Sequence, residues 1–218
     1  MNKKKILKVI GIILLIIFVI FLIHTIRNYI IITNLQNKIS KYSNSTNYHI
    51  KSTSISDEGT KVTMEYYRKD DRQVVFMERN LNGEIVKLSM YDNGERTDTF
   101  TESNDSKVVQ LNTGGIMSVN IYNFLETDNN WQTMLGSMVA KIKSTNYNGK
   151  DCYIVSEFLS STSLTSEGQK NYIEKDTGLF VKTEGTGMNM EREYEFDNVD
   201  DSIFAEPDIS QYTLKENN

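Results

Sequence analysis

The residues that could carry catalytic or metal chemistry are few in this chain of 218 residues. It has two histidines, His24 and His49, and one cysteine, Cys152. A zinc site built from Cys and His needs three or four such ligands, and a Ser–His–acid triad would have to use His49. His49 alternates with Tyr48 and Ile50, so we expect it on the solvated face of a strand. With no G-x-S-x-G, S-x-x-K, P-loop or G-x-G-x-x-G motif, the sequence predicts no enzyme of these classes, no cofactor and no metal site.

Two groups of residues contain the carboxylates that acid catalysis or calcium binding uses, but they lack the spacing that either function requires. Asp176-Thr177-Gly178 matches the D-T-G tripeptide of aspartic proteases, which need two carboxylates that share a proton. The chain has one copy between alternating segments, so we interpret it as a hairpin turn. Asp197, Asp200 and Asp201 lack the D-x-D-x-D-G calcium loop, and we expect a solvated turn there. Cys152 is expected to be a small core residue.

The methionines form the pattern that most suggests a function. Five of the eight internal methionines fall in predicted strands, mostly on the apolar side, and two fall in a predicted helix. Methionine is flexible and polarizable, and it recurs both in ordinary cores and at adaptable binding surfaces. The candidate ligand-binding residues, on the apolar concave face of a sheet and on this helix, are Met64, Met77, Met90, Trp131, Met134, Met138, Met188 and Met190.

The segment that locates these residues in the cell is the apolar stretch Ile6–Ile23, in which Lys8 is the one charge. Extended through Arg27 it is about 22 residues, or roughly 33 Å of helix, which matches a hydrocarbon core of about 30 Å. A cleaved signal peptide also has a basic start and an apolar centre. The length of the run and the absence of an A-x-A-like site after it favour an uncleaved signal anchor.

The distribution of charge predicts how this anchor is oriented in the membrane and which partners the C-terminal domain disfavours. Four lysines lie at or before position 8, so the N-terminus is predicted to be cytoplasmic and the C-terminal domain extracytoplasmic. Residues 57–218 carry 16 basic and 29 acidic residues, a net charge of −13 that disfavours nucleic acid as a partner. The predicted organisation is a cytoplasmic tail (1–5), a transmembrane signal anchor (6–27), a juxtamembrane amphipathic helix (28–43) and one extracytoplasmic domain (44–218).

The hydrophobic period changes from 3.6 to 2 along this organisation. Ile32, Leu35, Ile39 and Tyr42 form one helical stripe, which indicates either a solvated stalk or, as we favour, a helix that docks onto the domain. From Asn47 onward, alternating segments with Asn-Gly turns indicate a meander of antiparallel strands. The pattern breaks between residues 112 and 145. There it indicates a helical turn at Ile121–Glu126 and a short helix at Asn130–Ile142, with Trp131, Met134, Leu135, Met138 and Ile142 on one apolar side.

Three segments prompt a comparison with a known family. YNGKDCYIVSEF (147–158) looks like a glycine followed by a strand that carries tyrosine, and NYIEKDTGLFVKTE (171–184) like a strand–Asp-x-x-Gly–strand hairpin. YEFDNVDDSIFAEPDISQY (194–212) looks like a closing strand with a Phe-x-x-Pro-Asp tail. Over residues 28–212 the chain resembles the LolA/RseB-like superfamily of bacterial cell-envelope proteins.

The resemblance implies an α+β fold, in which a leading amphipathic helix enters a strongly curved antiparallel sheet. This half-open barrel would be capped by short helices and follow the transmembrane helix. The implied function is non-catalytic binding of a lipophilic ligand or lipoprotein at the cell envelope, with an acyl chain or lipidated peptide on the methionine-rich surface. The alternative is an RseB-like sensor or protein-interaction module that regulates a membrane partner. The chain keeps an anchor where the soluble carriers are released, so a shuttling role is not expected.

Overall fold

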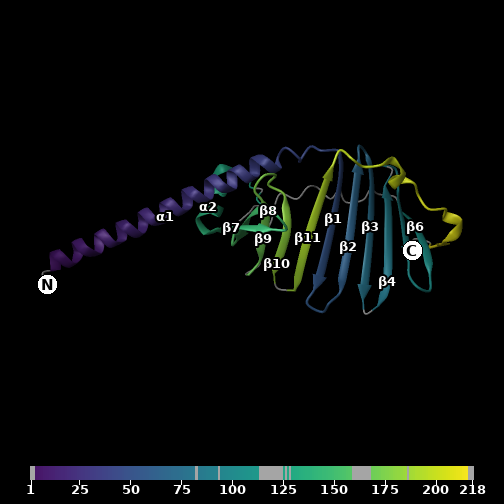
Figure 1. Cartoon of the computed structure of the whole chain (residues 1–218), viewed down its shortest axis with the longest axis horizontal. Coiled ribbons are helices and arrows are strands. Elements are labelled where there is room, and N and C mark those ends of the chain that lie inside the picture. Colours follow the sequence, from purple (N-terminus) through teal and green to yellow (C-terminus); the bar gives the residue numbers. More distant parts are fainter. Residues whose placement is uncertain are drawn as a thin grey trace. The chain divides into compact units, whose positions relative to one another are not determined.

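The computed structural model describes residues 3–81, 83–92, 94–112, 125, 127, 129–158, 168–185 and 187–215. The chain divides into two compact units, each made of two segments of sequence (Figure 1). Unit 1 comprises Met1–Ser40 and Asn123–Leu179, and unit 2 comprises Lys41–Tyr122 and Phe180–Asn218. The predicted limits of the anchor, the juxtamembrane helix and the extracytoplasmic domain stay predictions.

Unit 1 combines two helices with three strands among its described residues. Its elements are α1 (Lys3–Ile39), α2 (Asn130–Val139), β7 (Lys141–Tyr147), β8 (Lys150–Ser156) and β9 (Lys170–Glu174). The strands form an antiparallel meander in the order β7-β8-β9. The Asn148-Gly149 turn between the first two strands has positive φ at both residues, as predicted for a type I′ hairpin.

The helix α1 is continuous across the predicted junction between anchor and amphipathic helix. Its N-terminal part extends away from the rest of unit 1 in Figure 1, and its side chains there are exposed. Among the described residues, α1 is the one helix that is long and apolar enough to cross a membrane. Ile32, Leu35 and Ile39 are buried, as predicted for a docking stripe, and α1 ends before Tyr42.

Unit 2 contains a large open sheet that is mostly antiparallel. Its first strands are β1 (Asn47–Ser56), β2 (Lys61–Lys69), β3 (Arg72–Leu81), β4 (Glu84–Asp92), β5 (Thr97–Glu102) and β6 (Lys107–Asn112). After unit 1 follow β10 (Phe180–Gly185), β11 (Met188–Phe196), the 3-10 helices η1 (Asp201–Phe204) and η2 (Ile209–Gln211), and β12 (Thr213–Leu214). The strand order is β12-β6-β5-β4-β3-β2-β1-β11-β10, and β12 pairs with β6 in parallel.

The strand register assigns every side chain of this sheet to one of two faces, because alternate residues point to opposite sides. We call the side that carries Met64, Met77 and Met90 the methionine face and the other side the opposite face. At one end of the opposite face, an aromatic and aliphatic cluster is covered by Phe204 and Tyr212 of the closing segment. Its buried members are Val74, Tyr91, Phe100 and Val109. The tail that follows the closing strand β11 thus packs on this face through Phe204 and Tyr212.

The fold class is confirmed as an apolar N-terminal helix combined with a mostly antiparallel open sheet. Strong curvature into a half-open barrel and capping helices stay predictions. The helical turn predicted at Ile121–Glu126 falls, apart from Leu125, outside the described residues. The prediction for Asn130–Ile142 is wrong at its end, because the helix stops at Val139 and Ile142 lies in β7.

Candidate functional site

The methionine face brings distant methionines into adjacent register. Met64 of β2 pairs with Met77 of β3, and Met77 pairs with Leu88 of β4. One step along the ladder, Met90 of β4 pairs with Val75. All three methionine side chains are half-buried. Neighbours in register on one face of a sheet lie about 5 Å apart, so these strands present a continuous apolar surface.

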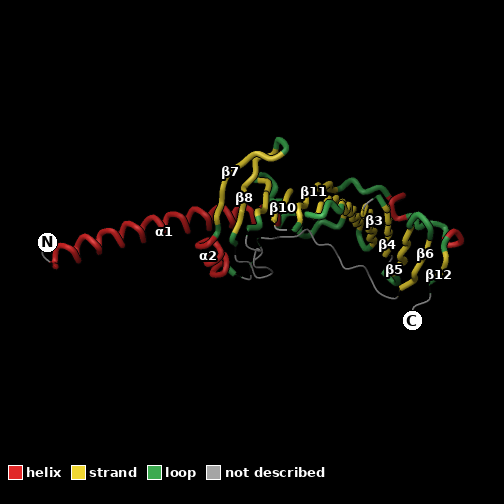
Figure 2. Tube along the Cα trace, turned by 90° about the horizontal axis from the view of Figure 1, so that it is seen from below, coloured by secondary structure: helices red, strands yellow, loops and turns green. Residues whose placement is uncertain are grey.

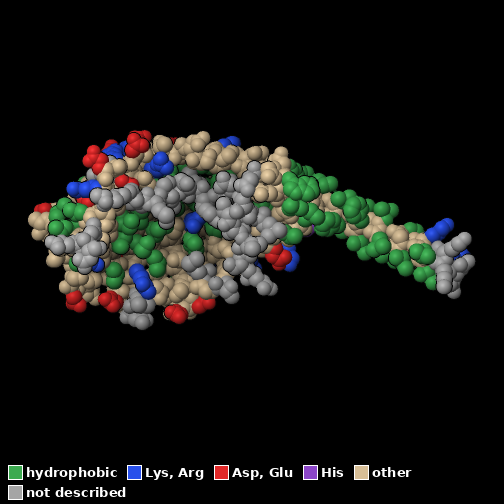
Figure 3. Space-filling model, turned by 180° about the vertical axis from the view of Figure 1, so that it is seen from behind, with side chains coloured by type: hydrophobic (Ala, Val, Ile, Leu, Met, Phe, Trp, Pro, Cys, Tyr) green, Lys and Arg blue, Asp and Glu red, His purple; other side chains and the backbone are tan. Residues whose placement is uncertain are grey.

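The same face continues across β1 to β11, with small residues in between. Met190 of β11 pairs with Ser54 of β1, and Met188 pairs with Ser56. Ser52 of β1 pairs with Met64 on one side and with Arg192 on the other. The row of serines in β1 is therefore flanked by longer side chains from both neighbouring strands. Figure 3 shows hydrophobic side chains gathered over the sheet of unit 2.

Two polar groups accompany this apolar surface. The hydroxyl of Ser52 is buried, and it has no hydrogen-bond partner among the described residues. The strand register puts Arg192 on this face, and its guanidinium carbon lies 5.3 Å from the centroid of the Phe180 ring, a cation–π arrangement. The surface thus combines adaptable apolar side chains with a cation and a buried hydroxyl.

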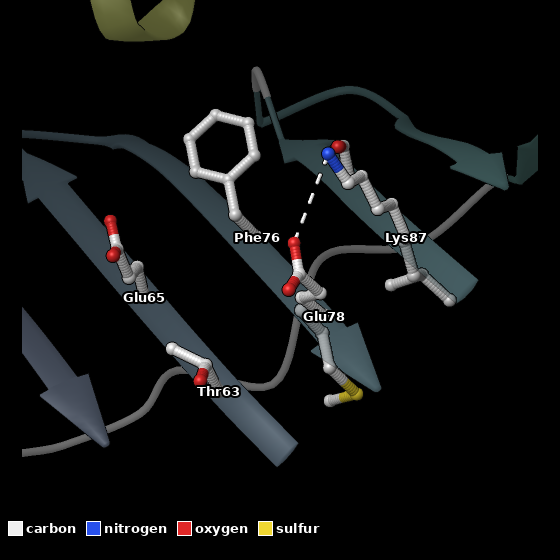
Figure 4. A pocket seen from close by; sticks show the side chains of 8 residues that line it. Thr63, Glu65, Phe76, Glu78 and Lys87 are labelled. Atoms are coloured by element: carbon white, nitrogen blue, oxygen red, sulfur yellow. Dashed lines mark ion pairs between the residues drawn. The ribbon is translucent and has the colours of Figure 1, made fainter. Parts of the chain in front are cut away.

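The opposite face has a shallow hollow of different character. It has a volume of about 270 Å³ and is lined by Thr63, Glu65, Phe76, Met77, Glu78, Lys87, Leu88 and Ser89. Figure 4 shows Thr63 and Glu65 entering it from β2, Phe76 and Glu78 from β3, and Lys87 from β4. Glu78 and Lys87 form an ion pair of 3.8 Å across it. The lining of this hollow combines the charged side chains of Glu65, Glu78 and Lys87 with the apolar ring of Phe76.

His49 lies on the opposite face, as predicted, but the expectation that it is solvated is wrong. Its ring stacks on Tyr67 with centroids 4.1 Å apart, and its side chain is 15% exposed. Nδ1 lies 3.4 Å from a carboxylate oxygen of Glu195, and Nε2 lies 3.7 Å from Glu65. Tyr67 donates a hydrogen bond of 2.6 Å to Glu65, and burial together with this carboxylate raises the pKa of Tyr67 above its ordinary range. The Tyr67 hydroxyl is hydrogen-bonded to Glu65, and its ring meets His49 by stacking.

The remaining candidate groups have structural partners. The Asp200 side chain caps η1, and the Asp201 carboxylate forms ion pairs with Lys69 and Arg72. Asp197, Asp200 and Asp201 are all exposed, so the prediction that these carboxylates are solvated is confirmed. Asp176-Thr177-Gly178 is a turn, as predicted. Cys152 is fully buried, and burial raises the pKa of its thiol. Over the described ranges, His, Cys, Asp and Glu form no group of three that could bind a metal ion.

The three candidate residues on α2, Trp131, Met134 and Met138, belong to unit 1, whereas the methionine face belongs to unit 2. The apolar side predicted for α2 is not the side that is buried. The buried residues of α2 are the small ones, Thr133, Gly136 and Ser137, whereas Trp131 is exposed and Met134 and Met138 are half-buried. Small side chains allow close packing against α1, and the larger ones are left outside.

Comparison with known proteins adds a likeness of fold. Neither the scan against family models nor the search of curated proteins gives a match. An uncharacterized conserved protein from Thermus thermophilus is similar at 9% identity, covering 84% of this chain and 98% of that chain, with a TM-score of 0.45.

Two further solved structures show a likeness at lower TM-scores. MucB, solved in complex with MucA(peri), matches at 10% identity over 80% of this chain and 59% of its own, with a TM-score of 0.35. A LolA superfamily protein from Nitrosomonas europaea matches at 10% identity over 80% and 97%, with a TM-score of 0.24.

Proposed function

We propose that this protein is a membrane-anchored, extracytoplasmic protein of the cell envelope that binds a lipophilic ligand or lipoprotein without catalysis. The observation that carries the proposal is the strand register, which aligns Met64, Met77, Met90 and Met190 on one face of the sheet. The supporting observation for the anchor is α1, which is long and apolar enough to cross a membrane. The basic N-terminus favours a cytoplasmic start and an outside domain.

The chemistry of the methionine face fits an apolar chain of variable shape. Methionine side chains rearrange at low cost, so a surface of half-buried methionines adapts to a flexible acyl chain. The serines of β1 provide a shallow row between the longer side chains of β2 and β11, where an extended chain would lie. Arg192, in register with Ser52, offers a cation to an acidic head group at one end of this row.

The direct test is photolabelling of the full chain, purified in detergent, with a diazirine derivative of palmitate. Mapping of the labelled peptides separates unspecific labelling of α1 from labelling of β2, β3 and β11. In the variant Met190→Asp, a charge on the methionine face should reduce labelling of these strands several-fold. Asn189→Asp is the matched control, because it puts the same charge one residue away on the exposed opposite face.

The outcomes are distinct. Loss of strand labelling in Met190→Asp with retention in Asn189→Asp supports the methionine face as the ligand site. Equal labelling in both variants, with unchanged circular dichroism, contradicts it. Labelling confined to α1 in the unmodified chain also contradicts it, and leaves the proposed anchor intact.

A second function, a sensor or protein-interaction module that regulates a membrane partner, is favoured by the hollow on the opposite face. Its charged pair Glu78 and Lys87 and the ring of Phe76 suit a polar peptide better than a lipid. Under this alternative, Lys87→Glu would reduce the amount of envelope protein that becomes crosslinked to this chain in cells. The variant Met190→Asp would leave that capture unchanged.

A further inference from the structure

The helix α2 exposes a ridge of large apolar side chains. Trp131, Leu135 and Val139 follow each other at intervals of four residues, so they share one side of the helix. Their exposed fractions are 62%, 39% and 45%. The ten residues of α2, NWQTMLGSMV, include no charge. We call these three side chains the α2 ridge.

The outward direction of this ridge is fixed by the way α2 packs on α1. The inward side of α2 is made of Thr133, Gly136 and Ser137, all buried. The side-chain amide of Asn28, which is fully buried in α1, donates hydrogen bonds of 3.1 Å to the carbonyl of Ser137 and 2.7 Å to that of Ala140. These bonds tie the C-terminal end of α2 to one turn of α1, so the ridge cannot rotate inward without breaking them.

The turn of α1 that receives α2 comes directly after the apolar stretch. Ile23 and Asn28 are five residues apart, or about 7.5 Å along a helix. On α1 itself, Ile23, Ile26 and Ile30 remain exposed, so the apolar surface continues past the level at which α2 binds. Figures 1 and 2 both place α2 at the end of unit 1 that is nearest to the protruding part of α1.

We propose that the α2 ridge inserts into the interfacial layer of the same bilayer that α1 crosses, with Trp131 at the level of the head groups. This inference rests on the proposed anchoring by α1. Tryptophan favours the membrane interface because its ring is apolar while its N–H still finds a polar partner. An uncharged short helix, bound beside the end of a membrane span, places its apolar side chains within reach of the acyl boundary. The ridge thereby fixes the height and tilt of unit 1 at the membrane surface.

The chain contains a single tryptophan, so the emission of Trp131 reports this contact directly. The full chain is reconstituted into phosphatidylcholine–phosphatidylglycerol vesicles whose lipids are brominated near the glycerol or near the methyl end of the acyl chain. We expect blue-shifted emission, and several-fold stronger quenching by the shallow bromines than by the deep ones. The double variant Leu135→Ser/Val139→Ser changes exposed positions, so the fold is kept while the quenching falls.

The matched control moves the reporter within the same unit. In Trp131→Phe/Tyr147→Trp, the tryptophan lies at the far end of β7, about 20 Å from Lys141 at 3.3 Å per residue. This reporter should be quenched by aqueous iodide and spared by brominated lipid. Equal bromine quenching of Trp131 and of the Tyr147→Trp reporter, in protein that floats with the vesicles after carbonate extraction, overturns the ridge and leaves the anchor standing. Failure to float overturns the anchor, and the ridge inference with it.

Discussion

Gly178 is the position at which a single methyl group should disturb unit 1 most. It follows Asp176 and Thr177 in the turn after β9 and has a φ of +73°. A Cβ built on it would lie 2.5 Å from the carbonyl oxygen of Leu35 and 3.0 Å from the backbone nitrogen of Ile39 in α1. Backbone atoms cannot move aside as a flexible side chain can. Gly178→Ala therefore combines an unfavourable backbone conformation with a collision against the docked end of α1.

Gly149 provides a matched control in the same unit. It has a φ of +80°, but a Cβ there would meet no atom within 4 Å. A left-handed conformation costs an L-residue about 1–2 kcal/mol, so this is the expected loss for Gly149→Ala. Overpacking adds typically about 1–3 kcal/mol, so Gly178→Ala should lose about 2–5 kcal/mol in total. For a protein of about 150–250 residues, the difference between the variants corresponds to roughly 2–12 °C in Tm.

The assay follows Trp131 emission of the full chain in detergent during heating, because this single tryptophan lies in unit 1. The unmodified chain, Gly149→Ala and Gly178→Ala are compared at one protein and one detergent concentration. The reasoning is refuted if the two variants have the same Tm within error. That result would mean that the turn and α1 do not make the close approach at Gly178.

Three further results are expected. Asn28→Ala should cost about 1–3 kcal/mol of unit 1 stability in denaturant titrations, because two buried carbonyls lose their donor; an unchanged midpoint would contradict this. Burial and the Asp98 carboxylate raise the pKa of Glu206, so its protonated form stabilises the fold below the ordinary Glu pKa and this stabilisation is lost as pH rises. Glu206→Gln should therefore raise Tm at pH 7 and not at pH 4, and a gain equal at both would argue against the linkage. Arg192→Gln should weaken photolabelling by the palmitate probe and spare its methyl ester, whereas equal loss for both would exclude a role for the charge.

Much of the architecture follows from short-range patterns that the sequence displays directly. The length of Ile6–Ile23 predicts a helix able to span a membrane, and α1 contains it. Strict alternation, as in Met188–Phe196, predicts strands because side chains in a strand alternate between faces. The Asn148-Gly149 pair predicts its turn because few other residues accept positive φ. These features depend on neighbours within a few residues.

The candidate site was predictable in part. Alternation predicts which residues lie on the apolar side of each strand, and most of the strand methionines are among them. Which methionine pairs with which could not, because register depends on the partner strand. The row of Ser52, Ser54 and Ser56 depends on the position of β1 between β2 and β11, which local alternation does not predict. The spacing of the serines alone does not predict that they lie between strands with longer side chains.

The largest differences come from helix α2 and from His49. Apolar spacing predicted that Trp131, Met134 and Leu135 share one side of the helix, but tertiary packing buries the small residues of α2 instead, because α1 approaches closely there. Alternation predicts which face of the strand His49 occupies, but not what covers that face. Glu65, Tyr67 and Glu195 reach His49 from neighbouring strands, so the prediction that it is solvated is wrong.

The sequence by itself thus determined the membrane-compatible helix, most strands and the exclusion of familiar catalytic motifs, since these depend on local composition and period. The tertiary structure alone decided which side of α2 is buried, which methionines are neighbours and where the apolar ridge lies relative to α1. Those outcomes depend on contacts between separate elements, from Met64 and Met77 in neighbouring strands to Asn28 and Ser137, which lie 109 positions apart in the chain, and no local period encodes them.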